Sequence, residues 1–446
     1  MSFTNYQPSI KKQNPSHIWH PCSQMKDYIN LEPMLIKSAR GSYIELENGK
    51  KIIDAISSWW CKLLGHNHPY IKAKVIEQIN KFEHVILANT INEKIIELSK
   101  KLTNKTQNLN KIFYAGDGSC AVEIALKMSL HSRKIKDQKH KNKFIALENG
   151  YHGETIGALS VSDLGIYKNP YKELLFDVYT ISNIPYVNSK ENPLWNDCSL
   201  QWREIEEKLE KIKEGVTAII FEPIVQGAGG MKIYSKDFLS KLKAWAEAND
   251  IHLIADEIMT GICRTGKMFA YEYANIEPDF LCLSKGLTSG WLPFSAVMVK
   301  DEIYDLFYND YSPENSFLHS HTYCGNPLGV SAALATLEII ENENILGKTK
   351  TLETKMFNSM NKIAAKTGRL KNVKGIGGIV AADLLIDKNS KNKRIGFEIF
   401  KQTIQLGALL RPLGNTIYWL PPVNIEEHTL QELSQITEYS ITSYFK

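Results

Sequence analysis

IHLIADE (251–257) and DFLCLSK (279–285) are the two stretches of sequence that decide the fold. Each contains a short apolar run that ends in one charged residue, Asp256 in the first and Lys285 in the second. Short apolar runs are typical of buried strands, and a lysine is rarely buried without a partner. The pattern predicts two strands of one sheet, and it leaves two readings for Lys285, a side chain that extends to the surface or one that does chemistry.

Further apolar runs alternate with helix-like stretches along the middle of the chain. The strand-like runs include KIFYAG (111–116), KFIALE (143–148) and VTAIIFEP (216–223), and AVEIALKMSLHS (121–132) and KDFLSKLKAWAEAND (236–250) are predicted helices. Strands that alternate with helices indicate an α/β fold with a largely parallel sheet and helical crossovers. Such sheets bind ligands at the carboxyl ends of their strands, which is where we expect Asp256 and Lys285.

The two ends of the chain have different patterns. YIELENGKKIIDAI (43–56) alternates around Asn48-Gly49, a dipeptide that favours a tight turn between two strands. From about residue 330 an apolar helix leads to KGIGGIVAADL (374–384), which predicts an α+β unit. We therefore expect an N-terminal segment, 1–64, that contributes to a small domain, a large domain, 65–329, and a C-terminal small α+β domain, 330–446.

Composition narrows the class of protein. The 446 residues are 43% hydrophobic and carry a formal net charge of +4, so we expect a globular protein with no nucleic-acid partner. The densest basic run, RKIKDQKHKNK (133–143), is predicted to be a solvated loop between a helix and a strand. No stretch approaches the roughly 18 apolar residues of a membrane-spanning helix, and the first residues lack an apolar signal core. We therefore expect a cytoplasmic protein with no membrane association.

Cysteine and histidine patterns argue against disulfides and metal. The seven cysteines are scattered and contain no C-x-x-C pair, which is typical of reduced thiols. His66 and His68 in GHNHP lack a nearby set of acids or cysteines, so hydrogen bonding within a loop is the favoured interpretation. We expect no metal.

Asp256 and Lys285 together fit a pyridoxal phosphate (PLP) site. A lysine amine condenses with the aldehyde of this cofactor, and a carboxylate pairs with its protonated pyridine nitrogen. At about 4 Å and an effective dielectric constant near 20, such a pair contributes about 4 kcal/mol. Alone, each residue has an ordinary reading as a surface lysine or a loop cap. The hypothesis rests on finding both at one predicted sheet edge.

Two further features suit the same cofactor. Gly118, Ser119 and Cys120 stand at a predicted helix N-terminus, where free backbone N–H groups bind anions such as phosphate. Gly-Ser before a helix is common, so a plain helix start is the alternative reading. Tyr151, in ENGYHGETIGALS (148–160), follows a predicted strand and is placed either to stack on the cofactor ring or to pack on the core.

Longer motifs link these residues in one order. IADEIMTGICRTGKMFAYE (254–272), PDFLCLSKGLTSGWLP (278–293) and HSHTYCGNPLGVSAA (319–333) resemble the signature of the class III, or omega, aminotransferases of PLP fold type I. More narrowly, the chain is similar to the biotin-pathway branch of that family. The motifs that carry this second resemblance are HIWHP (17–21), SSWW (57–60), NGYHGET (149–155), EPIVQGAGGM (222–231) and RPLGNTIYWLPP (411–422).

The resemblance implies roles for the residues that match the motifs. Lys285 is expected to bind the cofactor covalently and to transfer protons, Asp256 to bind the pyridine nitrogen, and Tyr151 to stack over the ring. It assigns cofactor binding to Gly118, Ser119, Tyr151, Asp256 and Lys285, with Thr322 contributed from the other subunit of a homodimer with shared active sites.

Substrate roles follow from the same resemblance. Trp59 and Trp60 are expected to wall the substrate channel, Arg411 to pair with a substrate carboxylate, and Tyr418 and Arg264 to line the pocket. Independently of the family, an apolar slot with one cationic end suits a fatty amino-keto acid. Packing in the core is the alternative for the tryptophans, and a surface ion pair is the alternative for Arg411.

The resemblance implies an enzyme that transfers an amino group from S-adenosylmethionine to 8-amino-7-oxononanoate and forms 7,8-diaminononanoate in biotin biosynthesis. Where the family usually reads W-H-P-Tyr, this chain has Cys22, so lysine stays open as the donor. His321 and Glu154 are further departures that we expect to be tolerated. The motifs are also compatible with an aminotransferase for ornithine, γ-aminobutyrate or a diamine, with a PLP-dependent mutase or racemase, and with a non-catalytic binding protein of the same fold.

Overall fold

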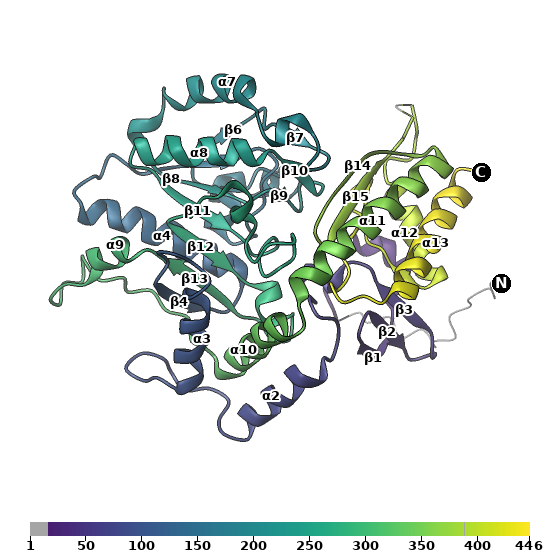
Figure 1. Ribbon diagram of the computed structural model, residues 1–446, viewed down its shortest axis with the longest axis horizontal. Coiled ribbons are helices and arrows are strands. Elements are labelled where there is room, and N and C mark those ends of the chain that lie inside the picture. Colours follow the sequence, from purple (N-terminus) through teal and green to yellow (C-terminus); the bar gives the residue numbers. More distant parts are fainter. Residues whose placement is uncertain (1–16, 388) are drawn as a thin grey trace.

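A seven-stranded sheet forms the centre of the large part of the molecule (Figure 1). The computed structural model describes residues 17–387 and 389–446. The strand order is β4-β13-β12-β11-β8-β5-β6, and only β13 runs antiparallel to its neighbours. This confirms the predicted mostly parallel sheet. The strands are β4 (Lys111–Ala115), β5 (Lys143–Leu147), β6 (Val178–Ile181), β8 (Val216–Phe221), β11 (His252–Asp256), β12 (Phe280–Leu283) and β13 (Ser295–Val299).

Helices cover both faces of this sheet, so its central strands are buried on both sides. Alternate residues of a strand point to opposite faces. Ile254 of β11 packs in a cluster with α4 (Gly118–Ile135), whereas Leu253 and Ala255 pack in the cluster that contains α8 (Lys236–Ala248). Burial on both faces explains why the sequence of β11 is an unbroken apolar run and not an alternating one.

Strands from the two ends of the chain meet in a second sheet. β1 (Ile36–Arg40), β2 (Tyr43–Leu46) and β3 (Lys51–Asp54) are antiparallel, and β16 (Ala408–Leu409) adds to β3 in parallel. The predicted turn at Asn48-Gly49 is confirmed, since it joins β2 to β3. Gly49 has a φ of +80°, which glycine adopts without strain.

The C-terminal part is built around a three-stranded antiparallel sheet with helices packed on it (Figure 1). This confirms a smaller α+β unit to which both ends of the chain contribute, while the boundaries after residues 64 and 329 stay a prediction. Its elements are α11 (Ile345–Thr367), β14 (Leu370–Ile376), β15 (Ile379–Leu384), α12 (Ile395–Leu406), β17 (Thr416–Trp419) and α13 (Glu427–Tyr444). Along the lower edge of the molecule in Figure 1, α10 (Pro327–Asn342) packs against α2 (Pro69–Ile79) and α3 (Glu93–Thr103).

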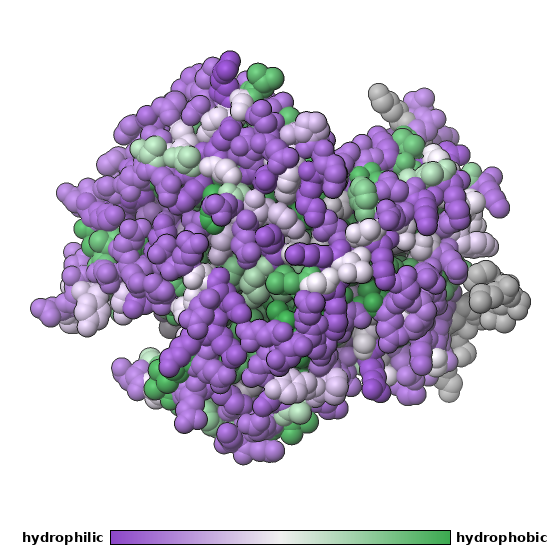
Figure 2. Space-filling model, in the orientation of Figure 1, coloured by the Kyte–Doolittle hydropathy of each residue, from purple (hydrophilic) through white to green (hydrophobic). Residues whose placement is uncertain are grey.

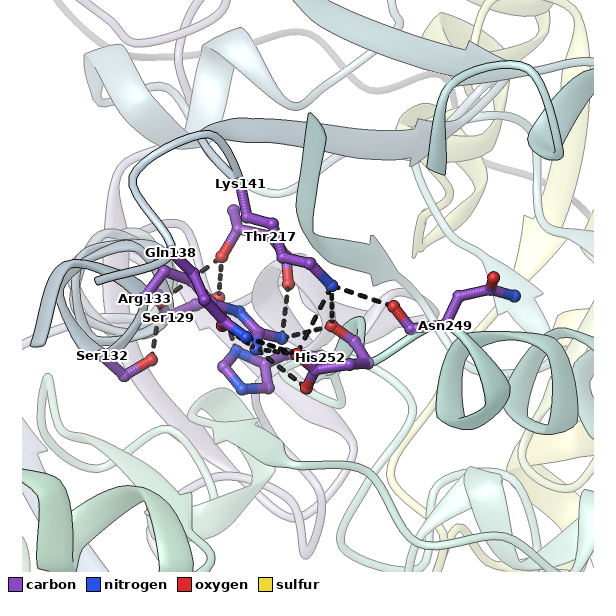
Figure 3. Close-up of polar contacts among 9 residues, drawn as sticks. Ser129, Ser132, Arg133, Gln138, Lys141, Thr217, Asn249 and His252 are labelled. Atoms are coloured by element: carbon purple, nitrogen blue, oxygen red, sulfur yellow. Dashed lines mark hydrogen bonds and ion pairs between the residues drawn. The ribbon is translucent and has the colours of Figure 1, made fainter. Parts of the chain in front are cut away.

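A buried polar network lies where β11 begins (Figure 3). Arg133 donates to both carboxylate oxygens of Asp250 at 2.9 Å, and Lys141 donates to the carbonyl oxygen of Asp250 at 2.7 Å. His252 lies 2.9 Å from the hydroxyl of Ser129. We call this set the amino-end network; its members are Ser129, Arg133, Gln138, Lys141, Thr217, Asn249, Asp250 and His252.

The amino-end network corrects the prediction of a solvated loop over 133–143. Helix α4 continues to Ile135, so Arg133 lies in its last turn and is fully buried, and Lys141 is buried as well. The physical reason is that the chain reverses at Asp250 between α8 and β11 and leaves carbonyl oxygens that need donors. Only part of the basic run, including Lys134, Lys136 and Lys139, is exposed.

Candidate active site

A cavity of about 480 Å³ lies at the carboxyl ends of the central strands. Asp256 and Lys285 both line it, because β11 and β12 are parallel neighbours with Asp256 paired to Cys282. This confirms that the two charged residues end neighbouring strands at one edge of the sheet. The residues predicted from the sequence that line this inner cavity are Trp60, Gly118, Ser119, Tyr151, Asp256 and Lys285.

Lys285 begins a short 3-10 turn directly after β12, and its amine has no ion pair or hydrogen bond among the described residues. Its Nζ lies 4.8 Å from the ring centroid of Trp60. Burial lowers the pKa of Lys285, while the negative charges of Asp256 and Glu222 act in the opposite direction. A lowered pKa increases the fraction of neutral amine, which is the nucleophilic form.

Asp256 is held in one orientation by two hydrogen bonds. Its Oδ1 accepts the backbone N–H of Ile258 at 3.1 Å, and its Oδ2 lies 2.8 Å from Nδ1 of His152. Both side chains are buried, and Nε2 of His152 has no hydrogen-bond partner among the described residues. The imidazole of His152 therefore orients the carboxylate of Asp256 through Nδ1, and its Nε2 remains available for another contact.

Glu222 adds a carboxylate that sequence reasoning missed. It directly follows β8, whereas Asp256 is the last residue of β11, and it accepts backbone N–H groups from Tyr151 at 3.0 Å and Gly227 at 2.9 Å. Burial raises the pKa of Glu222 to about 7; His152 opposes the shift and Asp256 reinforces it. The sequence VTAIIFEP could have identified Glu222, because an apolar run that ends in a charged residue is the pattern that identified Asp256.

The start of α4 also lines the cavity. Asp117 caps this 18-residue helix by accepting the N–H of Cys120, and the N–H groups of Gly118 and Ser119 have no partner within the helix. A Cβ on Gly118 would lie 2.8 Å from the side chain of Ile258, and a Cβ on Gly153 would lie 2.5 Å from the hydroxyl of Ser119. Both glycines are therefore required for the close approach of these loops.

The segment SSWW forms a left-handed turn, α1 (Ser57–Trp60), in which all four residues have positive φ angles between 47° and 75°. Each such non-glycine residue costs roughly 1–2 kcal/mol, so surrounding contacts must hold the turn. Nε1 of Trp60 donates to the hydroxyl of Tyr418 at 3.0 Å, which places Tyr418 directly behind the indole. The segment contains no glycine, so the sequence does not indicate this backbone.

A second cavity, of about 520 Å³, lies on the other side of this turn. Trp59, Cys22 and Arg411 line it, and the Arg411 guanidinium lies 5.0 Å from the Trp59 ring centroid. Nη2 of Arg411 donates to the carbonyl oxygen of Cys22, and the Cys22 thiol lies 3.8 Å from the Tyr167 hydroxyl. We call this the outer cavity. Arg411 and the ring of Trp59 form part of its wall, and Lys393 and the ion pair of Arg394 with Asp27 also line it.

Three residues assigned by resemblance, Tyr418, Arg264 and Thr322, line neither cavity. Arg264 is buried, and its Nη1 donates to the carbonyl oxygen of Pro421 at 2.6 Å, while its Nη2 has no hydrogen-bond partner in the described part of the chain. Thr322 is exposed, and its carbonyl oxygen lies 2.8 Å from Nε2 of His84. The roles of Arg264 and Thr322, like those of the other site residues, stay predictions.

The inner cavity fits PLP on the evidence of its own side chains. The half-buried amine of Lys285 lines a cavity that a fixed carboxylate, Asp256, also lines. Gly118 and Ser119, at the start of α4, offer free backbone N–H groups to a phosphate. Tyr151 contributes an aromatic ring to the same cavity. These are the donor, acceptor and covalent partner that the cofactor needs.

Two features are absent from the described residues: a metal-binding cluster and a membrane-spanning helix. In residues 17–387 and 389–446, no three His, Cys, Asp or Glu side chains are grouped to hold a metal ion. His66 instead lies 2.8 Å from the carboxylate of Asp54. No helix in the described part of the chain is long and apolar enough to cross a membrane.

Known proteins resemble the chain over nearly its full length. The family model "Aminotransferase class-III" matches residues 25–441. The adenosylmethionine-8-amino-7-oxononanoate aminotransferase of Helicobacter pylori is 41% identical over 432 residues, which are 96% of each chain. The enzyme of that name from Aquifex aeolicus is 35% identical over 97% of each chain.

Solved structures agree with these matches. The crystal structure of adenosylmethionine-8-amino-7-oxononanoate aminotransferase from Methanocaldococcus jannaschii superposes with a TM-score of 0.87 at 34% identity, covering 96% of this chain and 97% of that one. A PLP-bound amine transaminase from an uncultivated Pseudomonas species has a TM-score of 0.87 at 26% identity, covering 99% of this chain and all of that one.

Proposed function

Because the chain belongs to the class-III aminotransferases, we propose that it transfers an amino group from S-adenosylmethionine to 8-amino-7-oxononanoate, with PLP as cofactor. The product is 7,8-diaminononanoate, and the reaction belongs to biotin biosynthesis. The observation that carries the proposal is the pairing of Asp256 and Lys285 at neighbouring strand ends in one cavity, in a chain whose relatives bear this activity in their names.

The residues of the inner cavity would hold PLP in one orientation. Lys285 is the covalent partner, Asp256 pairs with the pyridine nitrogen, Tyr151 stacks on the ring, and Gly118 and Ser119 bind the phosphate. When bound, PLP supplies an electron sink that stabilises negative charge on the α-carbon of the amino donor. His152 holds the carboxylate of Asp256 in the orientation that this pairing needs.

Lys285 also carries the proton transfers. With PLP bound, Lys285 would hold it covalently and would become a free amine when a donor amine takes its place. Because burial lowers its pKa, the free Lys285 would serve as a base that takes the α-proton of the donor and delivers it to the cofactor carbon that the lysine had occupied. Trp60 covers this amine on one side and excludes water from it.

The outer cavity is suited to the carboxylate end of the acceptor. Arg411 offers a guanidinium that binds carboxylates bidentately, and Trp59 offers an apolar surface to the alkyl chain. Tyr418 supports Trp60 between the two cavities through its hydroxyl. Arg264 lies close to the turn, and its Nη2 has no hydrogen-bond partner among the described residues. Family resemblance assigns it to the same pocket.

Cys22 bears on the choice of donor. The Cys22 thiol is a weak hydrogen-bonding group. The hydroxyl of Tyr167, 3.8 Å away, supplies a phenol beside it. Burial, reinforced by Cys22, raises the pKa of Tyr167 to about 12, so this hydroxyl is protonated at neutral pH and can donate to a substrate. A phenol at this place supports S-adenosylmethionine as donor despite the cysteine.

We further propose a homodimer that shares its active sites. Thr322 is exposed in the single chain and free to reach the phosphate site of a second copy. Apolar side chains are exposed along the nearby segment, including Val85, Ile86, Ile91 and Tyr323. Figure 2 shows hydrophobic side chains along the lower edge of this face, in the region of α2 and α3. A second copy would bury these groups.

The cytoplasm is the proposed location. All seven cysteines are free thiols, including the exposed Cys22, and none is paired. Free thiols are typical of proteins in a reducing compartment.

The test is a product analysis with the purified protein. 8-Amino-7-oxononanoate is incubated with S-adenosylmethionine, lysine, ornithine or γ-aminobutyrate, and 7,8-diaminononanoate is detected by mass. Formation with S-adenosylmethionine supports the proposal, and formation with lysine alone moves the protein to the other donor. Absence of diaminononanoate with every donor contradicts the assignment of the acceptor.

A further inference from the structure

The left-handed turn α1 separates the two cavities. Trp60 lines the inner cavity and lies over Lys285, whereas Trp59 lines the outer cavity under Arg411. Trp59 and Trp60 are adjacent in sequence, but their indoles line different cavities. The left-handed backbone directs the two side chains away from each other. Any contact that fixes this backbone therefore sets the geometry of both cavities together.

Asp54 is the residue that fixes it. This carboxylate is fully buried at the end of β3, and each of its two oxygens makes two polar contacts. Oδ1 accepts the backbone N–H groups of Ile56, at 3.3 Å, and Ser58, at 2.9 Å. Oδ2 accepts the hydroxyl of Ser58 at 2.7 Å and lies 2.8 Å from Nε2 of His66.

The position of Asp54 in the fold suits this function. β3 is bonded to β2 on one side and to β16 on the other, so the carboxylate is anchored to a sheet made by both ends of the chain. His66 is fixed in turn by backbone hydrogen bonds with Gly41 at 2.8 and 2.9 Å. The turn is thus held from two rigid sides, which a strained backbone of four non-glycine residues requires.

We propose that Asp54 is a positioning residue for the transamination: it holds the left-handed turn so that Trp60 covers the Lys285–cofactor link and Trp59 forms the acceptor wall. The inference rests on the proposed function, since it concerns the same site. Asp54 touches neither cavity, so its effect passes through Ser58 to the two tryptophans.

Asp54→Asn tests the proposal, with Asp279→Asn as a matched control. Asn replaces one carboxylate oxygen by an N–H₂ group, which cannot accept from both of the donors that face it. Asp279 is also a buried carboxylate that accepts a backbone N–H, from Leu253 at 2.7 Å, but it lies at the amino end of β12, away from both cavities. Both changes remove a buried negative charge, and only the first disturbs the turn.

Three properties of the PLP-loaded proteins are compared: the melting temperature, the circular dichroism of the cofactor absorption band, and kcat and KM for 8-amino-7-oxononanoate. The dichroism reports the asymmetry of the groups around the cofactor and does not require turnover. For Asp54→Asn we expect reduced dichroism and a KM raised about tenfold, because misplacement by about 1 Å is costly in a site of this kind. Asp279→Asn should lower the melting temperature and leave dichroism and KM unchanged.

The proposal is overturned if Asp54→Asn only lowers the melting temperature, as the control does, with dichroism and KM as in the wild type. Should Asp54→Asn fail to fold, His66→Leu removes one partner of the carboxylate and must change dichroism and KM in the same direction, or the proposal falls. A wild-type protein with no cofactor band would instead contradict the proposed function, so the two failures are distinguishable.

Discussion

Strand β11 begins at His252, inside the amino-end network, and ends at Asp256, in the inner cavity, so one five-residue strand joins two buried polar clusters. In the amino-end network the charges are paired, because Arg133 and Lys141 both contact Asp250, although Nε of Arg133 has no hydrogen-bond partner among the described residues. In the inner cavity the amine of Lys285 has no ion pair, and Nε2 of His152 has no partner among the described residues.

The difference separates a stabilising cluster from a reactive one. Buried polar groups that satisfy each other hold a fold together, while groups that remain unsatisfied beside a cavity have capacity for a ligand. Both clusters are rich in charge, so charge alone does not identify the site. Changes in the inner cavity are therefore expected to alter chemistry with little loss of stability, and changes in the amino-end network to do the reverse.

The largest effect is expected for Lys285→Ala. Removal of the amine eliminates both the covalent partner of the cofactor and the group that transfers protons, so turnover should fall at least about 10⁴-fold. The melting temperature of the cofactor-free protein should stay close to that of the wild type. Substantial turnover by this variant would contradict the assignment of Lys285.

Asp256→Asn should follow in size. Loss of an ion pair worth about 4 kcal/mol to the ring nitrogen corresponds to a fall in kcat of about 10³-fold. The amide can still accept the N–H of Ile258, so the local structure should be kept. Single-turnover rates with S-adenosylmethionine measure the effect, and a rate within about threefold of wild type would show that the carboxylate charge is not used.

At the other end of β11, Asp250→Asn should affect stability alone. It leaves the fully buried Arg133 without its counterion, which we expect to cost about 2 kcal/mol, less than for a fully buried pair because Asp250 itself is half exposed. Arg133→Met should cost less, since the remaining carboxylate can turn to water. Urea unfolding measures both variants, and kcat should be unchanged in each. An equal loss of kcat would erase the contrast between the clusters.

Near neutral pH the smallest effect is expected for His252, because its titration affects stability only in acid. Burial lowers the pKa of His252 from 6.5 to about 3, so the folded state keeps it neutral where the unfolded state binds a proton. Its contribution to stability is therefore complete above about pH 6.5 and is lost towards pH 3, at about 1.4 kcal/mol per pH unit. His252→Gln should flatten the acid side of the stability curve. If the fall of stability with decreasing pH is the same in both proteins, His252 binds a proton as readily in the folded state as in the unfolded state.

The sequence was sufficient for the sheet and for the residues at its edge. The apolar runs before Asp256 and Lys285 have one interpretation as buried parallel strands, and β11 and β12 confirm it. The pattern of a charge after a strand would also have identified Glu222. Burial of Arg133 was not predictable, because a basic run is normally solvated and only the chain reversal at Asp250 explains the exception.

The walls of the substrate site depend on backbone geometry that local sequence does not encode. The left-handed turn at Ser57–Trp60 contains no glycine and is held by Asp54 from β3 and His66 from beyond the turn. Arg411 and Cys22 meet although they lie 389 positions apart in the sequence. Such contacts follow from tertiary packing, and the family resemblance supplied the residues where the pattern alone could not.

The most direct test of the account is a single half-reaction of the wild-type protein. The PLP-loaded protein is mixed separately with S-adenosylmethionine and with lysine, and the absorbance of the Lys285-linked cofactor is followed. The account predicts that S-adenosylmethionine removes this absorbance and lysine does not. Loss of the absorbance with lysine alone, or with neither amine, would contradict it.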